Sequence, residues 1–362
     1  MLTKTSLEFI QHLLGSTDVK EHVPTPYLRK LFQRFHRQKQ SYTIVPDNTH
    51  RKTGKYPESY FIGKSMMTKL RKCENIHCIS WTVMTMNNVS VKCSLNMYYD
   101  KKLIPKNKID ILVDAISFVA SFSNKDRDLT IHLALLNDKK RFRKNLTALH
   151  VNSGSCSFTD TVAEVCVFRA EECLKVLFHE CIHALRFSRI GVCKTVDDVY
   201  GERYNLNSKD ILLDETYTEI WARLLNCYYV SQFGSGNALD KFCSCVALEK
   251  IFSLYQANKI IMPLASQNTA KQNRAKRTMK RVLPRRNLDK YTNVTAYYLG
   301  SAEVFQHLNE FLQFTDCEPY LKDTTGFHDF MKGECQKIPK MKIDPKDRKH
   351  GTMRMTVIEL EI

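Results

Sequence analysis

The segment at residues 170–189 restricts the fold of this chain most, because it carries the clearest helical periodicity in the sequence. Two glutamates in its first turn and two arginines in its last turn complement a helix dipole, and Gly191 is the expected stop. An apolar run at 164–168, which predicts a strand, leads directly into this segment. Apolar residues recur at intervals of three and four, which predicts an amphipathic helix: Leu174, Leu177, Phe178, Cys181, Ile182 and Leu185.

The same helix carries the motif His179-Glu180-Cys181-Ile182-His183. Two histidines four residues apart lie one turn apart on one helix face, so both imidazoles can reach one zinc ion. Glu180 stands beside the open coordination position, where it takes a proton from a zinc-activated water and returns it to a leaving amine. Chance gives about 0.02 such motifs in a chain of this composition. The motif therefore favours a zinc site over a helix with two structural histidines.

A second pair of candidate site residues lies downstream. Glu215 and Glu219 are four residues apart in a helix predicted over 209–229. Carboxylates so placed repel each other unless a positive charge joins them, and zinc with its histidines supplies such a charge. One glutamate would then be the third ligand, and the other would accept a hydrogen bond from the free nitrogen of a ligand histidine. The alternative is a solvated acidic face, and Glu202 also falls within the interval between the two motifs.

A helix with His-Glu-x-x-His followed by a helix with Glu-x-x-x-Glu resembles the gluzincin clan, the thermolysin-like zinc metallopeptidases. The resemblance implies that Glu215 is the third ligand, that Glu219 supports a ligand histidine, and that Asp214 stands where the family has asparagine. It also implies an edge strand at 148–154, followed by the strand at 164–168. In the family, such an edge strand pairs with the extended backbone of the substrate.

A narrower likeness, over about residues 80–315, is to uncharacterised metallopeptidase-like proteins of large double-stranded DNA viruses. It rests on the residues at 151–154, 167–172, 179–184, 215–223, 296–298 and 311–314. The chain departs from the thermolysin-like pattern in the 31 residues between His183 and Glu215, which implies an insertion near 191–209. The residue that stabilises the oxyanion is left open among four candidates: Tyr217, Tyr297, Tyr298 and His307.

Composition limits the class of protein. The chain has 362 residues, 43% of them hydrophobic and 26% charged, which is typical of a globular protein. It has no run of 18 apolar residues and no apolar secretion signal at its start, so we expect no membrane span and an intracellular protein. The 13 cysteines are then expected to be mostly buried free thiols. Neither close pair, Cys73 with Cys78 nor Cys243 with Cys245, has the spacing of a structural zinc knuckle.

Positive charge is concentrated in one segment. The formal net charge is +17, and residues 271–290 contain nine basic residues and one acidic residue. Such a segment predicts contact with nucleic acid or another polyanion. The alternative is an exposed loop without a partner.

Together these patterns predict an α+β fold: a zincin-like domain at 80–315 with a small mixed sheet, the motif helix and a mainly helical part after it. A basic extension at 1–79 and a tail at 316–362 would flank this domain, and the basic segment would be a loop inserted in it. Further strands are predicted at 89–97, 129–135 and 353–360, and further helices at 109–122, 239–256 and 291–314.

The expected function is that of a zinc metallopeptidase. It would bind zinc through His179, His183 and Glu215, use Glu180 as general base, and act on peptides or proteins. The alternative is a viral structural or accessory protein that keeps the zinc site without turnover and binds nucleic acid.

Overall fold

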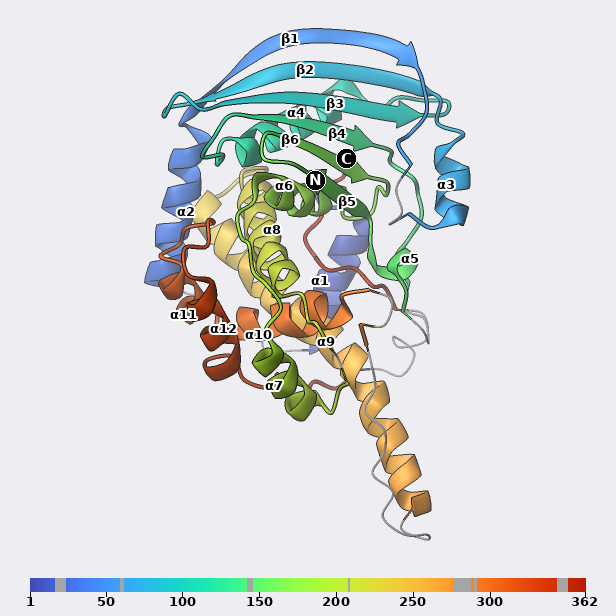
Figure 1. Ribbon diagram of the computed structural model, residues 1–362, viewed down its shortest axis with the longest axis vertical. Helices are drawn as coiled ribbons and strands as arrows, with labels where there is room; N and C mark the ends of the chain where they lie inside the picture. The colour runs from blue at the N-terminus through green and yellow to red at the C-terminus, as the bar shows by residue number, and fades with distance from the viewer. Residues whose placement is uncertain are drawn as a thin grey trace.

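The computed structural model describes residues 1–16, 24–58, 62–141, 146–207, 209–275, 288–289, 292–343 and 351–362, and of 262–275 only the backbone. In Figure 1 a mixed β-sheet forms one layer, with most of the helices packed beneath it. The strands are β1 Tyr42–Thr53, β2 Asn75–Thr85, β3 Ser90–Tyr99, β4 Arg127–Leu133, β5 Gly154–Phe158 and β6 Val162–Val167. The helices in the first half are α1 Lys4–Ser16, α2 Pro26–Lys39, α3 Lys64–Leu70, α4 Lys106–Ala120 and α5 Ala148–Val151. Those in the second half are α6 Cys173–Leu185, α7 Lys194–Tyr204, α8 Leu213–Ser231, α9 Ala238–Ala275, the π-helical η1 Thr295–Gly300, α10 Ser301–Gln306, α11 Leu308–Phe314 and α12 Thr324–Gly333.

The sheet has six strands in the order β1-β2-β3-β4-β6-β5. β1, β2 and β3 are antiparallel neighbours, while β4 runs parallel to both β3 and β6. β5 returns antiparallel to β6 and forms the edge of the sheet nearest to α6 (Figure 1). The expected α+β class with a mixed sheet is thereby confirmed.

The core lies between this sheet and the helices. The strands alternate, so that Val91, Cys93 and Leu95 of β3 face the helices and are buried. α6 packs against β5, β6, α4 and α8, and all of its residues except His183 are buried. The polar residues Lys175, His179 and Glu180 of α6 are therefore buried together with its apolar stripe, so each needs polar partners inside the protein.

Several predicted elements differ in their limits from the observed ones. The edge strand expected at 148–154 begins only at Gly154, because Thr147 and His150 form a capping box that starts the short helix α5. α6 ends at Leu185, where Arg186 adopts a left-handed conformation with φ of 58°, and not at Gly191. The helix expected at 291–314 is broken at His307. The interval at 191–209, where the resemblance implies an insertion, contains the helix α7.

The chain ends belong to the same core as the middle of the chain. The expected boundary at 79/80 falls inside β2, and β1 pairs with β2 along its whole length. At the other end, residues 353–358 are all buried. They form no strand, contrary to the expectation for 353–360, because buried carboxylates rather than a neighbouring strand bind their backbone N–H groups: Glu172 Oε1 accepts from Met355 and Thr356, and Glu249 Oε1 accepts from Val357 and Ile358.

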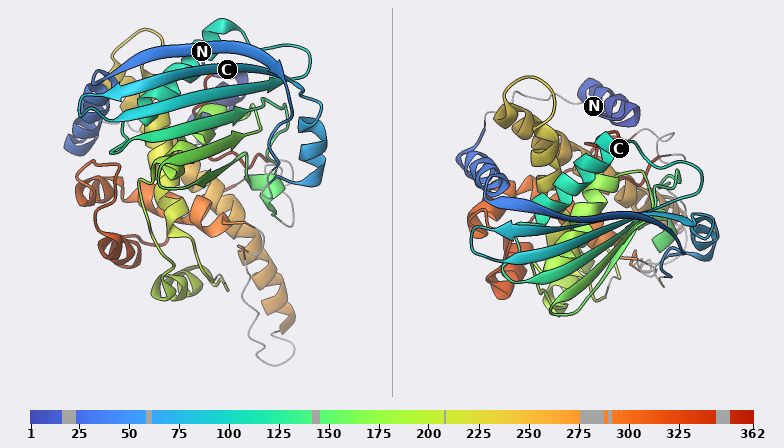
Figure 2. Two further views of the ribbon diagram at one scale, coloured as in Figure 1. Left: turned by 45° about the horizontal axis from the view of Figure 1, so that its top comes forward. Right: turned by 90° about the horizontal axis from the view of Figure 1, so that it is seen from above.

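α9 continues to Ala275, well beyond the helix expected at 239–256, and its second half projects from the body of the molecule (Figure 1). The basic segment at 271–290 follows, and most of it lies outside the described residues. All 13 cysteines are described, as free thiols, and ten of them are buried. Within the described part of the chain, no helix combines the length and apolarity needed to cross a membrane. Figure 2 shows the two ends of the chain close together on one side of the molecule.

Candidate metal centre

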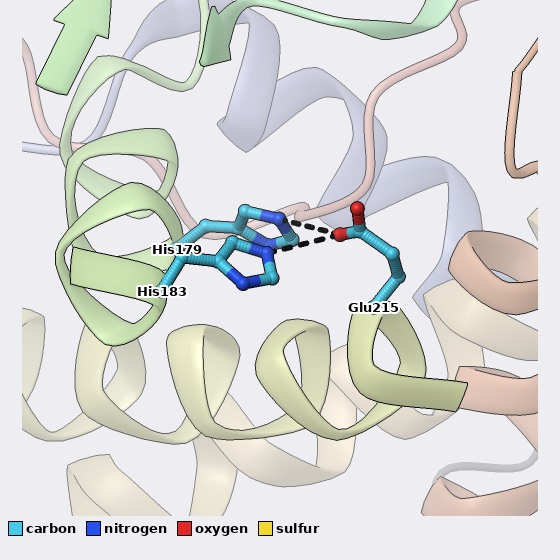
Figure 3. A group of neighbouring side chains, drawn as sticks. All are labelled: His179, His183 and Glu215. Carbon is cyan, nitrogen blue, oxygen red and sulfur yellow. Dashed lines mark hydrogen bonds and ion pairs between the residues drawn. The ribbon is translucent and has the colours of Figure 1, made fainter. Parts of the chain in front are cut away.

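Three candidate ligands converge between α6 and α8 (Figure 3). His179 and His183 project from the same face of α6, and Glu215 comes from the first turn of α8. Oε2 of Glu215 lies 3.2 Å from Nε2 of His179 and 3.1 Å from Nε2 of His183. The ligand-type atoms of the three residues all lie within 4.8 Å of one another. The structure therefore brings together the set of residues that the sequence motifs predict.

The spacing and chemistry of these atoms fit a zinc ion. Zinc takes imidazole nitrogen and carboxylate oxygen at about 2.0–2.1 Å in a tetrahedron, which places neighbouring ligand atoms about 3.3 Å apart. The observed separations of 3.1 and 3.2 Å are close to that value. Three protein ligands leave the fourth position for a water or substrate, the arrangement of a catalytic rather than a structural zinc site.

The electrostatics of the three residues also favour a cation. Burial lowers the pKa of His183, but Glu215 and Asp214 outweigh burial and hold this pKa well above its usual range. Burial raises the pKa of Glu215, and the two histidines more than reverse that effect. Glu215 thus stays ionised and stabilises positive charge at the imidazoles, whether a proton or a metal ion carries it.

Each ligand histidine has a carboxylate at its other ring nitrogen. Nδ1 of His179 lies 3.1 Å from Oε2 of Glu219, and Nδ1 of His183 lies 3.4 Å from Oδ2 of Asp214. Asp214 is held in turn by the hydroxyl of Ser188 at 2.6 Å. A carboxylate at Nδ1 keeps the proton there and leaves Nε2 free to bind metal. The supporting role of Asp214 was not predicted, although an acid directly before Glu215 is a visible signal.

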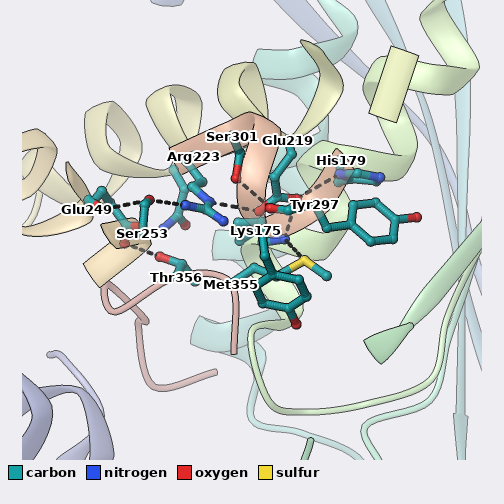
Figure 4. A network of polar contacts seen from close by, with 12 residues as sticks. Lys175, His179, Glu219, Arg223, Glu249, Ser253, Tyr297, Ser301, Met355 and Thr356 are labelled. Carbon is teal, nitrogen blue, oxygen red and sulfur yellow. Dashed lines mark hydrogen bonds and ion pairs between the residues drawn. The ribbon is translucent and has the colours of Figure 1, made fainter. Parts of the chain in front are cut away.

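Glu219 sits in a buried polar network (Figure 4). Its carboxylate accepts hydrogen bonds from Nζ of Lys175 at 2.8 Å and from Nε of Arg223 at 2.7 Å. Burial raises the pKa of Glu219, but Lys175 and Arg223 together with His179 outweigh burial and hold it well below its usual range. The sequence analysis missed both cations. Their spacing was the available signal, since each lies four residues from a predicted site residue on the same helix.

Glu180 lies against the edge strand and lines the same cleft as the candidate ligands. A Cβ atom on Gly154 would lie 2.7 Å from Oε1 of Glu180 and 2.9 Å from the carbonyl oxygen of Cys166. Gly154 therefore makes room for the glutamate against β5. Burial raises the pKa of Glu180, partly offset by His179 and His183. A carboxylate with a raised pKa is a stronger base, which suits a group that takes a proton from water.

An open cleft of about 470 Å³ joins these groups. Its lining includes the three candidate ligands, Glu180, β5 and part of 292–297. Phe158 and Leu212, two exposed apolar side chains, also line it. The outer edge of β5 pairs with no other described strand. The cleft thus places an edge strand next to the candidate metal ligands.

Of the four candidates for stabilising an oxyanion, Tyr297 is the one that lines the cleft, with its ring 5.9 Å from that of His179. The hydroxyl of Tyr217 donates to the carbonyl of Pro319, and that of Tyr298 to the carbonyl of Met353, so both are committed to the core. His307 lies at the break between α10 and α11.

Glu202 lies outside the candidate ligand set, whereas Asn293 contacts it. Glu202, the alternative ligand, is exposed on α7 and is not part of the group of candidate ligands. Asn293, which the sequence analysis did not identify, donates from Nδ2 to Oε1 of Glu215 at 3.3 Å. This contact leaves Oε2 of Glu215 directed at the histidines.

Comparisons with known protein families, with curated proteins and with solved structures find no match to this chain. The assignment of function therefore depends on the geometry of the site.

Proposed function

We propose that this chain is a zinc-dependent metallopeptidase of the gluzincin type, with a zincin-like fold. The observation that carries the proposal is the convergence of two imidazole nitrogens and one carboxylate oxygen beside a buried, unligated glutamate in an open cleft. A purely structural zinc site has no use for a free fourth position or for a buried base next to it.

Each residue of the site has a separate role in the proposed reaction. His179, His183 and Glu215 hold the zinc, which when bound polarises the scissile carbonyl and makes water more acidic. Glu180 accepts the proton of the attacking water at its carboxylate and passes it to the nitrogen of the leaving amine. Tyr297 donates from its hydroxyl to the oxyanion that develops at the carbonyl. Burial, with Glu215 and Glu180 nearby, raises the pKa of Tyr297 well above its usual range, so the hydroxyl keeps its proton.

The substrate would be an extended peptide. β5 is an edge strand that pairs with no second described strand and borders the cleft, and an extended backbone can pair with such an edge as an added strand. A peptide paired in this way would lie along β5, with one of its carbonyl groups next to the metal site. A cleft of about 470 Å³ has room for a few residues of such a peptide.

The decisive experiment replaces the proposed base. Glu180→Gln should retain one zinc per chain but cleave a peptide library about 10²–10⁴-fold more slowly, the usual contribution of a general base. Glu202→Gln, which changes an exposed glutamate of α7, is the matched control and should behave as the wild type. A Glu180→Gln enzyme with full activity would refute the mechanism. Stoichiometric zinc in a wild-type protein that cleaves nothing would favour the non-catalytic alternative.

A further inference from the structure

A second, small pocket, called the inner pocket below, adjoins the cleft beside Glu180. It shares Asn152, Gly154, His179, Glu180 and Tyr297 with the cleft, so the two spaces adjoin next to the proposed metal and base. Its volume is about 30 Å³. A side chain of a bound peptide that points inward from the residue next to the scissile bond would enter this inner pocket.

The walls of the inner pocket come from distant parts of the chain. Val151 of α5 and Val176 of α6 contribute two apolar sides, and Met355 of the C-terminal segment contributes a third. The backbone N–H groups of Met355 and Thr356 both donate to Oε1 of Glu172 at 2.6 Å. Met355 is only 4% exposed. Met355 is therefore fixed through its backbone and packed on nearly all sides, so its side chain cannot easily move aside for a larger group.

Part of the lining of the inner pocket is polar, and its two lysines are paired with buried glutamates. Nζ of Lys175 lies 2.8 Å from Glu219 and 3.4 Å from Sδ of Met355 (Figure 4), and Nζ of Lys140 lies 2.8 Å from Glu172. Ser153, which is 3% exposed, has no hydrogen-bond partner for its Oγ among the described residues. Both ammonium groups are thus neutralised by carboxylates, and the buried hydroxyl without a partner favours a ligand group that can form a hydrogen bond with it.

We propose that this inner pocket is a specificity subsite that restricts one residue beside the scissile bond to glycine, alanine or serine, with Met355 setting the size limit. The inference rests on the proposed peptidase function. A volume of about 30 Å³ holds roughly two water-sized groups. The two heavy atoms of a serine side chain match that room, whereas the four of leucine exceed it. Serine is favoured over alanine because its hydroxyl meets Ser153 and Lys175, and lysine and arginine are excluded by size.

The test uses the full-length, zinc-loaded protein and two readouts. The first is cleavage of a peptide library with identification of the residues on both sides of each cut. The second is the dissociation constant of a series of peptide hydroxamates that differ only in the side chain next to the zinc-binding group. For the wild type we expect cuts next to Gly, Ala or Ser, and serine hydroxamates that bind at least 10-fold tighter than leucine hydroxamates. Met355→Ala should enlarge the inner pocket and reduce that preference to less than 2-fold.

Met353→Ala is the matched control, because Met353 is equally buried in the same segment but does not line the inner pocket. It should keep the preference of the wild type. If Met355→Ala does not fold, Val176→Ala enlarges the same space from α6 and should relax the preference in the same direction. Tight wild-type binding or cleavage next to leucine would overturn the subsite while leaving the peptidase intact. Selective hydroxamate binding without cleavage of any peptide would instead retain the subsite and refute the peptidase.

Discussion

Replacing Glu219 by glutamine tests whether the buried network tunes the metal site, since this change keeps the shape of the side chain and removes its charge. Glu219 is fully buried, and its carboxylate contacts His179, Lys175 and Arg223. Replacing the charged partner at the second nitrogen of a ligand histidine by a neutral amide should weaken metal binding by about 10-fold, or about 1.4 kcal/mol, the lower end of the range for such outer partners. The two buried cations also lose their counter-charge, which lowers the free energy of unfolding by about 3–5 kcal/mol.

Two measurements separate these effects: competition with a chelator for zinc affinity, and denaturant unfolding of the metal-free protein. Glu303→Gln is the matched control. Glu303 is equally buried and accepts from Arg203 at 2.8 Å and from Tyr204 at 2.6 Å, but it contacts neither ligand histidine. It should lower the free energy of unfolding less, because Glu303 pairs with one cation rather than two, and should leave the zinc affinity unchanged. The reasoning fails if Glu219→Gln binds zinc as tightly as the wild type, or if both variants weaken zinc equally.

Three further changes test other parts of the site and its surroundings. His183→Ala should abolish stoichiometric zinc binding, measured by metal analysis, and retained zinc would exclude this ligand set. Gly154→Ala should keep the zinc but lower the cleavage rate about 100-fold, because the new Cβ would displace Glu180; an unchanged rate would show that the carboxylate position is not critical. Burial raises the pKa of Glu172, but Lys140 and two further cations hold it below its usual range. Its contribution to stability is therefore present above about pH 4.3 and is lost as the pH falls further, so Glu172→Gln should make the free energy of unfolding less sensitive to acid below that pH.

The candidate ligands could be predicted because each pair lies within one helix. Four-residue spacing puts His179 above His183, and Glu215 above Glu219, whatever the rest of the chain does. Which glutamate meets the histidines was implied only by resemblance. In the structure the first turn of α8 points at both Nε2 atoms, and Glu219, one turn deeper, reaches Nδ1 of His179.

The limits of the edge strand and the path of the C-terminal segment were predicted less well. A local capping box at Thr147 diverts 148–151 into a helix, although their composition suits a strand. Met353 to Leu360 alternate like a strand, yet Glu172 and Glu249 bind their backbone in place of a neighbouring strand. Both outcomes depend on hydrogen-bond partners that hydrophobic periodicity does not report.

The sequence alone thus determined the motif helix, the two pairs of site residues and the α+β class, because these follow from contacts within one helical turn or from alternation within one strand. Tertiary structure decided that the chain ends join the core, that Asp214, Lys175 and Arg223 support the site, and that Met355 closes a pocket beside Glu180. Met355 lies 180 residues from the lysine it contacts. Such a contact forms when residues far apart in the sequence are buried together, and no short-range pattern in the sequence predicts which of these residues will be in contact.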